Sequence, residues 1–150
     1  MVAVEKVGQP SKCHGRTGAS SMEKRKPVRS FEDLRVWQMG IDLVKRVYLL
    51  TGSGTFSRDF GLGDQIRRAS VSIPTNIAEG FERSSRKEYL LFLNIAKGSA
   101  GEVRSLLRVA FEVGYLEKAI YESMKADVTK LSGYMFNHIK AIKHSATRIA

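Results

Sequence analysis

The 150-residue chain carries 25 Lys and Arg against 15 Asp and Glu, a formal charge of +10, and 43% of its residues are hydrophobic. This length suits one domain with an ordinary core, and the charge favours a polyanionic partner such as RNA or DNA. The longest early apolar run is Met1 to Val4, and no run reaches the roughly 18 residues that indicate a membrane span. The sequence therefore predicts no membrane contact. The single Cys13, which cannot form an internal disulfide, favours a cytoplasmic location.

A basic segment precedes the first periodic pattern. Residues 1–30 hold seven basic and two acidic side chains (7 − 2 = +5), and residues 31–150 hold 18 and 13 (18 − 13 = +5). Segment 1–29 is rich in Gly, Ser and Lys, with too little apolar surface to fold. We expect a disordered basic tail, followed by one domain over 30–147. Met22 is an alternative translation start.

The first predicted helix covers roughly residues 31–52. Ser30 is a suitable N-cap, and Glu32 and Asp33 place negative charge where the helix dipole favours it. The glycines and polar residues of "TGSGTFS" end the helix. The stripe predicted to face the core recurs at spacings of three and four: Leu34, Trp37, Ile41, Val44, Tyr48 and Thr51.

The second predicted helix begins near Ser57 and contains a proline. Pro74 lacks a backbone N–H and its ring collides with a carbonyl of the preceding turn, which costs about 3 kcal/mol or more inside a helix. The apolar stripe keeps its phase on both sides, so we predict a kinked but continuous helix. Hydroxyls of Ser70 or Ser72, or a water, would satisfy the freed carbonyls. The stripe is Leu62, Ile66, Ala69, Ile73, Ile77 and Gly80.

Two longer helices complete the pattern. Ser85 and Glu88 have the spacing of a capping box and Gly114 is a natural stop, which predicts a third helix between them. Gly98 and Gly101 leave room in its middle for a close backbone approach. Its stripe is Tyr89, Phe92, Ala96, Ser99, Val103, Leu106, Ala110 and Val113. The fourth helix begins near Leu116, with the stripe Ile120, Met124, Val128, Leu131, Met135, His138 or Ile139, and Ile142.

Four helices with short connections and no strand-like alternation predict an all-α fold, an antiparallel up-down-up-down four-helix bundle. The segments "SFEDLRVWQ", "FGLGDQIRRASVSIPTNIAEG", "FLNIAKGS" and "GYL" resemble the bacterial four-helix-bundle family encoded in 23S rRNA intervening sequences, over about residues 30–145. This resemblance implies a left-handed bundle, a ring-like homopentamer and no assigned catalytic activity. It also implies kinship with the accessory variability determinants of retroelements, basic bundle rings that bind nucleic acid and a reverse transcriptase.

Apolar residues beyond the core stripes are candidates for subunit contacts. A monomeric bundle needs one broad stripe per helix, whereas the first and third helices carry a second apolar row. We predict an oligomer interface on these rows, and a wider core is the alternative. The predicted interface residues are Val36, Leu43, Val47, Leu50, Leu91 and Ile95.

Basic residues form the candidate nucleic-acid site, because several cations along a phosphate backbone give salt-dependent binding. The candidates are Lys97, Arg104, Arg108, Arg67, Arg68, Arg86 and Lys87. The first three share one side of the third helix. For Arg67 and Arg68 a structural role, with Asn76 or Glu79 as a partner, is slightly preferred. No aromatic residues interleave with these cations in the way that marks base stacking on single strands.

The residues Pro74, Asn76, Glu79 and Gly80 are interpreted as a structural motif, a proline kink and polar cap that position the corner between the second and third helices. Catalytic and metal-binding patterns such as Cys-x-x-Cys, a Walker loop or a nucleophile elbow are missing from the sequence. His138 is predicted to occupy a core or edge position. We therefore expect no enzyme activity, metal or cofactor.

Two hypotheses of function follow. The leading one is a non-enzymatic, self-assembling bundle that binds RNA or DNA through phosphate contacts. The alternative is a scaffold whose ring docks a protein, such as a reverse transcriptase or a ribosome-associated protein.

Overall fold

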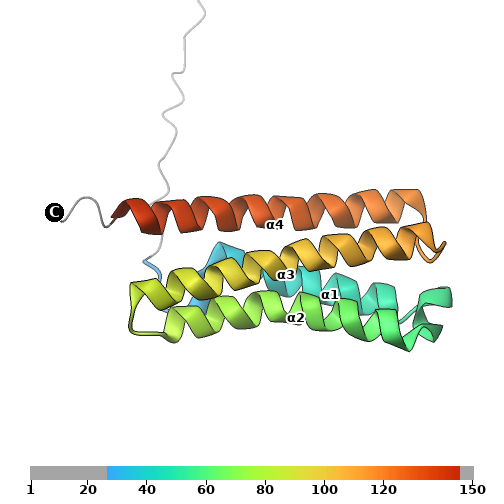
Figure 1. The fold of residues 1–150 in the computed structure, drawn as a ribbon, viewed down its shortest axis with the longest axis horizontal. Helices are drawn as coiled ribbons and strands as arrows, with labels where there is room; N and C mark the ends of the chain where they lie inside the picture. Colours follow the sequence, from blue (N-terminus) through green and yellow to red (C-terminus); the bar gives the residue numbers. More distant parts are fainter. Residues whose placement is uncertain (1–26, 146–150) are drawn as a thin grey trace, which may run out of the picture.

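The computed structural model describes residues 27–145 as four long helices that lie side by side (Figure 1). They are α1 (Arg35–Thr51), α2 (Phe60–Glu82), α3 (Arg86–Glu112) and α4 (Lys118–Ser145), with short 3-10 helices η1 (Phe31–Asp33) and η2 (Gly54–Arg58). Successive helices run in opposite directions and pack as neighbours, and α4 also packs against α1. No strand occurs within residues 27–145, and the predicted four-helix bundle is confirmed.

The predicted N-terminal tail and the predicted lack of membrane contact are the next two features. Almost all of the predicted tail, with Cys13 and Met22, lies in residues 1–26, outside the described part of the chain. Among residues 27–145, no helix has the length and apolar character that crossing a bilayer requires.

The helix starts differ from the predicted ones because short 3-10 turns precede them. Asp33 accepts hydrogen bonds from the N–H groups of Arg29 and Ser30 (2.9 and 3.1 Å) and closes η1, after which the extended Leu34 precedes α1. The start of α2 lies at Phe60 instead of near Ser57, since the side chain of Asp59 is the N-cap. Asp59 also accepts a hydrogen bond from the Tyr115 hydroxyl (3.0 Å), which ties the connection before α4 to the start of α2.

The apolar row of α1 that was predicted to contact another subunit faces the core. Val36, Leu43 and Val47 are 3%, 3% and 0% exposed, so the interface prediction is wrong for these three. The row predicted to face the core is less buried, and its Tyr48 is 49% exposed, so the core prediction is wrong at that position. Both rows of α1 are apolar, and periodicity alone does not decide which one faces inward. Leu50 is half-buried against the core. Leu91 and Ile95 are exposed, and for them the interface stays a prediction.

α2 is one uninterrupted helix that contains Pro74, as predicted. The proline ring packs on α1, since a Cβ atom added to Gly40 would lie 3.4 Å from the ring. Hydrogen bonds from the side chains of Thr75 (2.9 Å) and Asn76 (2.7 Å) reach the Val71 and Ser72 carbonyls beside the proline. Pro74 is therefore packed against α1, and the two side-chain hydrogen bonds reinforce carbonyls that follow the Ser70 carbonyl, the one that the proline leaves without its helical N–H donor.

The predicted role of Ser70 and Ser72 is wrong. A serine hydroxyl in a helix reaches back three or four residues, and that of Ser70 donates to the Arg67 carbonyl (2.8 Å), one turn before the carbonyls near Pro74. The Ser72 hydroxyl is used across the bundle, in a hydrogen bond with the Ser99 hydroxyl of α3 (2.9 Å).

α2 and α3 lie in close contact at Gly80. A Cβ atom at this position would lie 2.7 Å from Cβ of Phe92 and 3.1 Å from Cδ2 of Tyr89, so only glycine fits without a shift of α3. The close approach predicted at Gly98 and Gly101 is wrong, because a Cβ atom at either position would meet nothing within 4 Å.

The two kinds of helical glycine give a testable contrast. Gly80→Ala is expected to lower the free energy of unfolding by about 1–3 kcal/mol, because it overpacks the contact with Phe92. Gly98→Ala, at an open position, is the matched control and is expected to raise stability by up to about 1 kcal/mol through helix propensity alone. Urea denaturation of both variants measures the difference. Equal effects of the two substitutions would contradict the close contact.

Candidate nucleic-acid interface

Lys97, Arg104 and Arg108 lie on the flank of α3 that faces α4. At 100° per residue, the three directions fall within about 40° around the helix axis. Nζ of Lys97 lies 5.3 Å from the ring centre of Phe136, and the Arg108 guanidinium lies 5.9 Å from that of Tyr121, both on α4. The structure thus brings the three predicted residues together along one boundary between two helices.

α4 adds a fourth cation to this boundary. Nζ of Lys125 lies 5.7 Å from the ring centre of Tyr121, the ring that Arg108 also approaches. We call Lys97, Arg104, Arg108 and Lys125 the basic seam. The sequence did not indicate Lys125, because only the pairing of α3 with α4 places it beside Arg108.

Two aromatic rings of α4, Tyr121 and Phe136, lie beside cations of the basic seam. Tyr121 is buried and stacks on Phe111, with ring centres 4.7 Å apart and planes 10° apart. Phe136 is 52% exposed. Both α4 rings lie far along the sequence from the α3 cations that they contact, so no pattern within α3 indicates them.

The charges of the basic seam are only partly compensated. Arg108 forms an ion pair with Glu112. Hydrogen bonding to the Tyr121 hydroxyl is the larger cause that raises the pKa of Arg108, and the negative charge of Glu112 raises it further, so the guanidinium stays positive. Arg104 is exposed, and no ion pair or hydrogen bond to it occurs within residues 27–145. Glu102 lies on the other flank of α3, beside Arg68 of α2. The seam therefore keeps positive charge for an anionic ligand.

Arg67 has a structural role, but its partners differ from the predicted ones. Its Nε donates to the Thr51 hydroxyl (2.7 Å), and its guanidinium lies 4.9 Å from the ring centre of Tyr48, so it joins α2 to α1. The predicted partners are used elsewhere, since Asn76 donates to Ser72 and Glu79 pairs with Arg83.

Arg68, by contrast, is exposed. It lines a shallow hollow of about 530 Å³ between α1 and α2, where Asp64 and Thr75 are among its neighbours. Its environment leaves a binding role open to test, but it lies apart from the basic seam.

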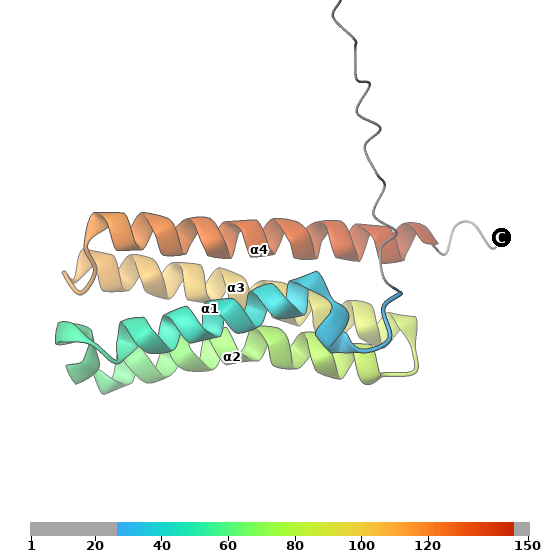
Figure 2. The same cartoon turned by 180° about the vertical axis from the view of Figure 1, so that it is seen from behind.

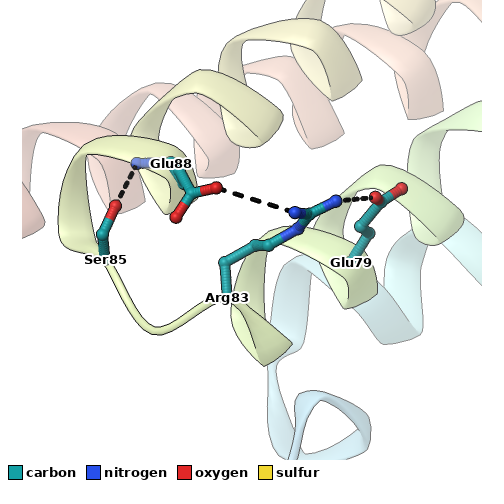
Figure 3. A network of polar contacts seen from close by, with 4 residues as sticks. All are labelled: Glu79, Arg83, Ser85 and Glu88. Atoms are coloured by element: carbon teal, nitrogen blue, oxygen red, sulfur yellow. Dashed lines mark hydrogen bonds and ion pairs between the residues drawn. The ribbon is translucent and has the colours of Figure 1, made fainter.

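The turn between α2 and α3 is closed by a small polar network (Figure 3). Arg83 bridges Glu79 (2.5 Å) and Glu88 (3.6 Å), and the Ser85 hydroxyl accepts the Glu88 N–H (3.1 Å). The Glu88 carboxylate thus points to Arg83 across the turn, where a full capping box would direct it to the backbone of Ser85. Glu79 of the predicted motif lies at this corner, whereas Asn76 donates to Ser72 within α2.

Arg86 and Lys87 lie beyond this network at one end of the bundle. Arg86 donates to the Ser145 hydroxyl at the end of α4 (3.5 Å), and Lys87 is exposed. The described chain also begins at this end (Figure 2). The +5 charge of residues 1–30 is therefore joined covalently to the end of the bundle that carries Arg86 and Lys87.

A half-buried polar pair links α3 to α4 near this end. The Tyr89 hydroxyl lies 2.8 Å from Nε2 of His138, and the two rings meet edge to face. Burial raises the pKa of Tyr89 to about 12 and lowers the pKa of His138. His138 is thus a packed edge residue, as predicted.

The fold and its surface are those of a small helical bundle protein, with one basic seam and no strand within residues 27–145. The chain belongs to the 23S rRNA-intervening sequence protein family, whose model matches residues 32–137. It is also similar to a solved structure from Bacteroides thetaiotaomicron, a protein of unknown function from the S23 ribosomal protein family. The two are 27% identical with a TM-score of 0.66, over 70% of this chain and 95% of that one. No curated protein matches the chain.

The Tyr89–His138 pair predicts a pH dependence of stability. The pKa of His138 is lower in the folded state than its ordinary value of about 6.5, so below pH 6.5 the unfolded chain binds the proton more readily. The contribution of neutral His138 to the free energy of unfolding is complete above about pH 6.5. It is lost as the pH falls toward the lowered pKa of His138 in the folded state. His138→Gln is expected to flatten the loss of unfolding free energy between about pH 7 and 5, measured by urea denaturation.

His144→Gln is the matched control for this measurement, because His144 is exposed at the end of the same helix. The control is expected to keep the pH dependence of the unsubstituted protein. A dependence that persists in His138→Gln would show that burial of His138 is not its source.

Proposed function

We propose that this protein is a non-enzymatic, cytoplasmic accessory protein that binds RNA or DNA through the basic seam. The observation that carries the proposal is the convergence of Lys97, Arg104 and Arg108 of α3 with Lys125 of α4 on one boundary. The family is named for an intervening sequence of 23S rRNA, and the similar structure belongs to a ribosomal protein family, which supports a nucleic-acid partner.

Phosphate contacts supply the affinity in this proposal. Each phosphate neutralised by Lys or Arg releases a counterion, so binding weakens with salt, with a slope of about −0.9 per contact on a log–log plot for duplex DNA. Contacts of this kind position a nucleic acid but do not read its sequence. Arg86, Lys87 and the basic N-terminal segment extend the positive surface at one end of the bundle.

Charge reversal in the basic seam tests this proposal. Lys97→Glu/Arg104→Glu/Arg108→Glu is expected to weaken filter binding of nucleic acid at low salt and to make the salt slope shallower by up to about 2.7, the loss of three contacts. The matched control, Arg35→Glu/Lys45→Glu/Lys130→Glu, changes the net charge equally at exposed positions of α1 and α4 away from the seam. Its effect is expected to be small. No binding by the unsubstituted protein, or equal losses in both variants, would refute the proposed surface.

We further propose that the protein assembles into a homo-oligomer, a pentamer as the family resemblance implies. Leu91 and Ile95 lie one turn apart on α3 and are 57% and 43% exposed. Neighbouring exposed apolar side chains of this kind mark interaction surfaces. They point about 120–160° away from Lys97 around the helix axis, so a contact made through them leaves the basic seam accessible.

Polar substitution of the two residues tests the assembly. Leu91→Gln/Ile95→Gln is expected to reduce the mass measured by light scattering to that of a monomer, without a large loss of stability, because neither side chain belongs to the core. Leu49→Gln/Ile120→Gln, at exposed apolar positions of α1 and α4, is the control and is expected to keep the oligomer. A monomeric unsubstituted protein, or an unchanged mass for Leu91→Gln/Ile95→Gln, would contradict this interface.

A protein-docking scaffold is the second candidate function. It is favoured by the exposed apolar side chains Leu49, in the last turn of α1, and Phe60, at the start of α2. A partner that stays bound in a pull-down after nuclease treatment would support the scaffold, and one released by nuclease would support the nucleic-acid reading.

A further inference from the structure

Phe136 is an exposed aromatic ring at one end of the basic seam. It is 52% exposed, although Met135 and Ile139 beside it in α4 are buried in the core. The Lys97 ammonium group lies 5.3 Å from its ring centre. The other α4 ring of the seam, Tyr121, is buried and stacked on Phe111. Phe136 is therefore the exposed ring of the seam, with the Lys97 ammonium group over one of its faces.

The α3 surface has an open position along the seam, at Gly101. Gly101 lies between Lys97 and Arg104 along the seam, and a Cβ atom placed on it would meet nothing within 4 Å. From Lys97 to Arg108 the helix advances 11 residues, about 16 Å. That length corresponds to about five stacked nucleotides at roughly 3.4 Å each. The seam thus offers an open track with a ring at one end and cations along it.

This combination selects one class of ligand. Cations alone attract any polyanion, but the face of an exposed ring is matched by an unpaired base, and base stacking on aromatic side chains is a general means of holding single strands. The bases of a duplex are already stacked and cannot reach the ring. A purely apolar partner is disfavoured because the charged groups of Lys97, Arg104 and Lys125 lie along the same track.

We propose that the basic seam binds a single strand of nucleic acid, with its phosphates along Lys97, Arg104 and Arg108 and one base stacked on Phe136. This inference rests on the proposed nucleic-acid function and narrows it to unpaired strands. The Phe ring carries no hydrogen-bonding group, so the stacked position tolerates any base.

Fluorescence anisotropy with the full chain tests the inference. The probes are a labelled 12-nucleotide RNA without internal pairing, the DNA strand of the same sequence, and the corresponding 12-base-pair duplex. Phe136→Leu is expected to weaken binding of a single strand about five- to 150-fold and to leave duplex binding unchanged. Tyr134→Leu is the matched control, since Tyr134 is 42% exposed on the same helix without a cation over its ring. It is expected to bind every probe like the unsubstituted protein.

Phe136→Trp keeps the test valid if Phe136→Leu folds poorly. The larger ring is expected to hold a single strand at least as tightly as Phe136 does. The inference is supported if the RNA strand, the DNA strand or both bind Phe136→Leu more weakly and Phe136→Trp at least as tightly as the unsubstituted protein. Circular dichroism of each variant verifies its fold.

The outcomes separate the inference from the proposed function. Failure to bind any of the three probes would refute the function itself. Salt-sensitive binding of all probes that neither Phe136→Leu nor Phe136→Trp alters would refute the stacking inference alone. Loss of a nuclease-resistant protein partner in Phe136→Leu, with single-strand affinity unchanged, would assign the ring to protein docking and also overturn the inference.

Discussion

The close approach of α2 to the helices on both sides is the constraint on which the bundle depends. On one side the ring of Pro74 packs against Gly40 of α1, and on the other Gly80 lets the backbone of α2 approach Phe92 and Tyr89 of α3. An interior proline costs a helix about 3 kcal/mol or more. Here its ring becomes part of a helix contact, and the side chains of Thr75 and Asn76 add hydrogen bonds to the helical carbonyls of Val71 and Ser72 beside it. Packing on both flanks offsets the cost and keeps α2 in one piece.

This packing also sets the rotation of α3 and thereby the position of the candidate site. Ser99 of α3 faces α2, where it forms a hydrogen bond with Ser72. With that flank of α3 fixed, the flank that carries Lys97, Arg104 and Arg108 faces α4. The half-buried Tyr89–His138 contact joins α4 to α3. The basic seam is therefore a consequence of how the helices pack, and no residue of the seam needs an unusual backbone conformation.

Local patterns in the sequence predicted the features that depend on local physics. The four helices, the stop at Gly114 and the continuity of α2 through Pro74 follow from periodicity and capping. Periodicity and capping did not predict the features that depend on which faces of the helices pack together. Both rows of α1 are apolar, so the choice of Val36, Leu43 and Val47 for the core required the packed structure. The rings beside Lys97 and Arg108 come from α4, and no pattern within α3 indicates them.

Native-state hydrogen exchange along α2 tests most directly the claim that its neighbours hold this helix together. Amides on opposite sides of Pro74, such as those of Ile73 and Ile77, are predicted to exchange with one common opening free energy, equal to that of global unfolding. An opening free energy that falls sharply for residues around Pro74, while the rest of α2 stays protected, would show that the helix opens locally at the proline. Such a result would contradict the packing account and, with it, the fixed orientation of the basic seam.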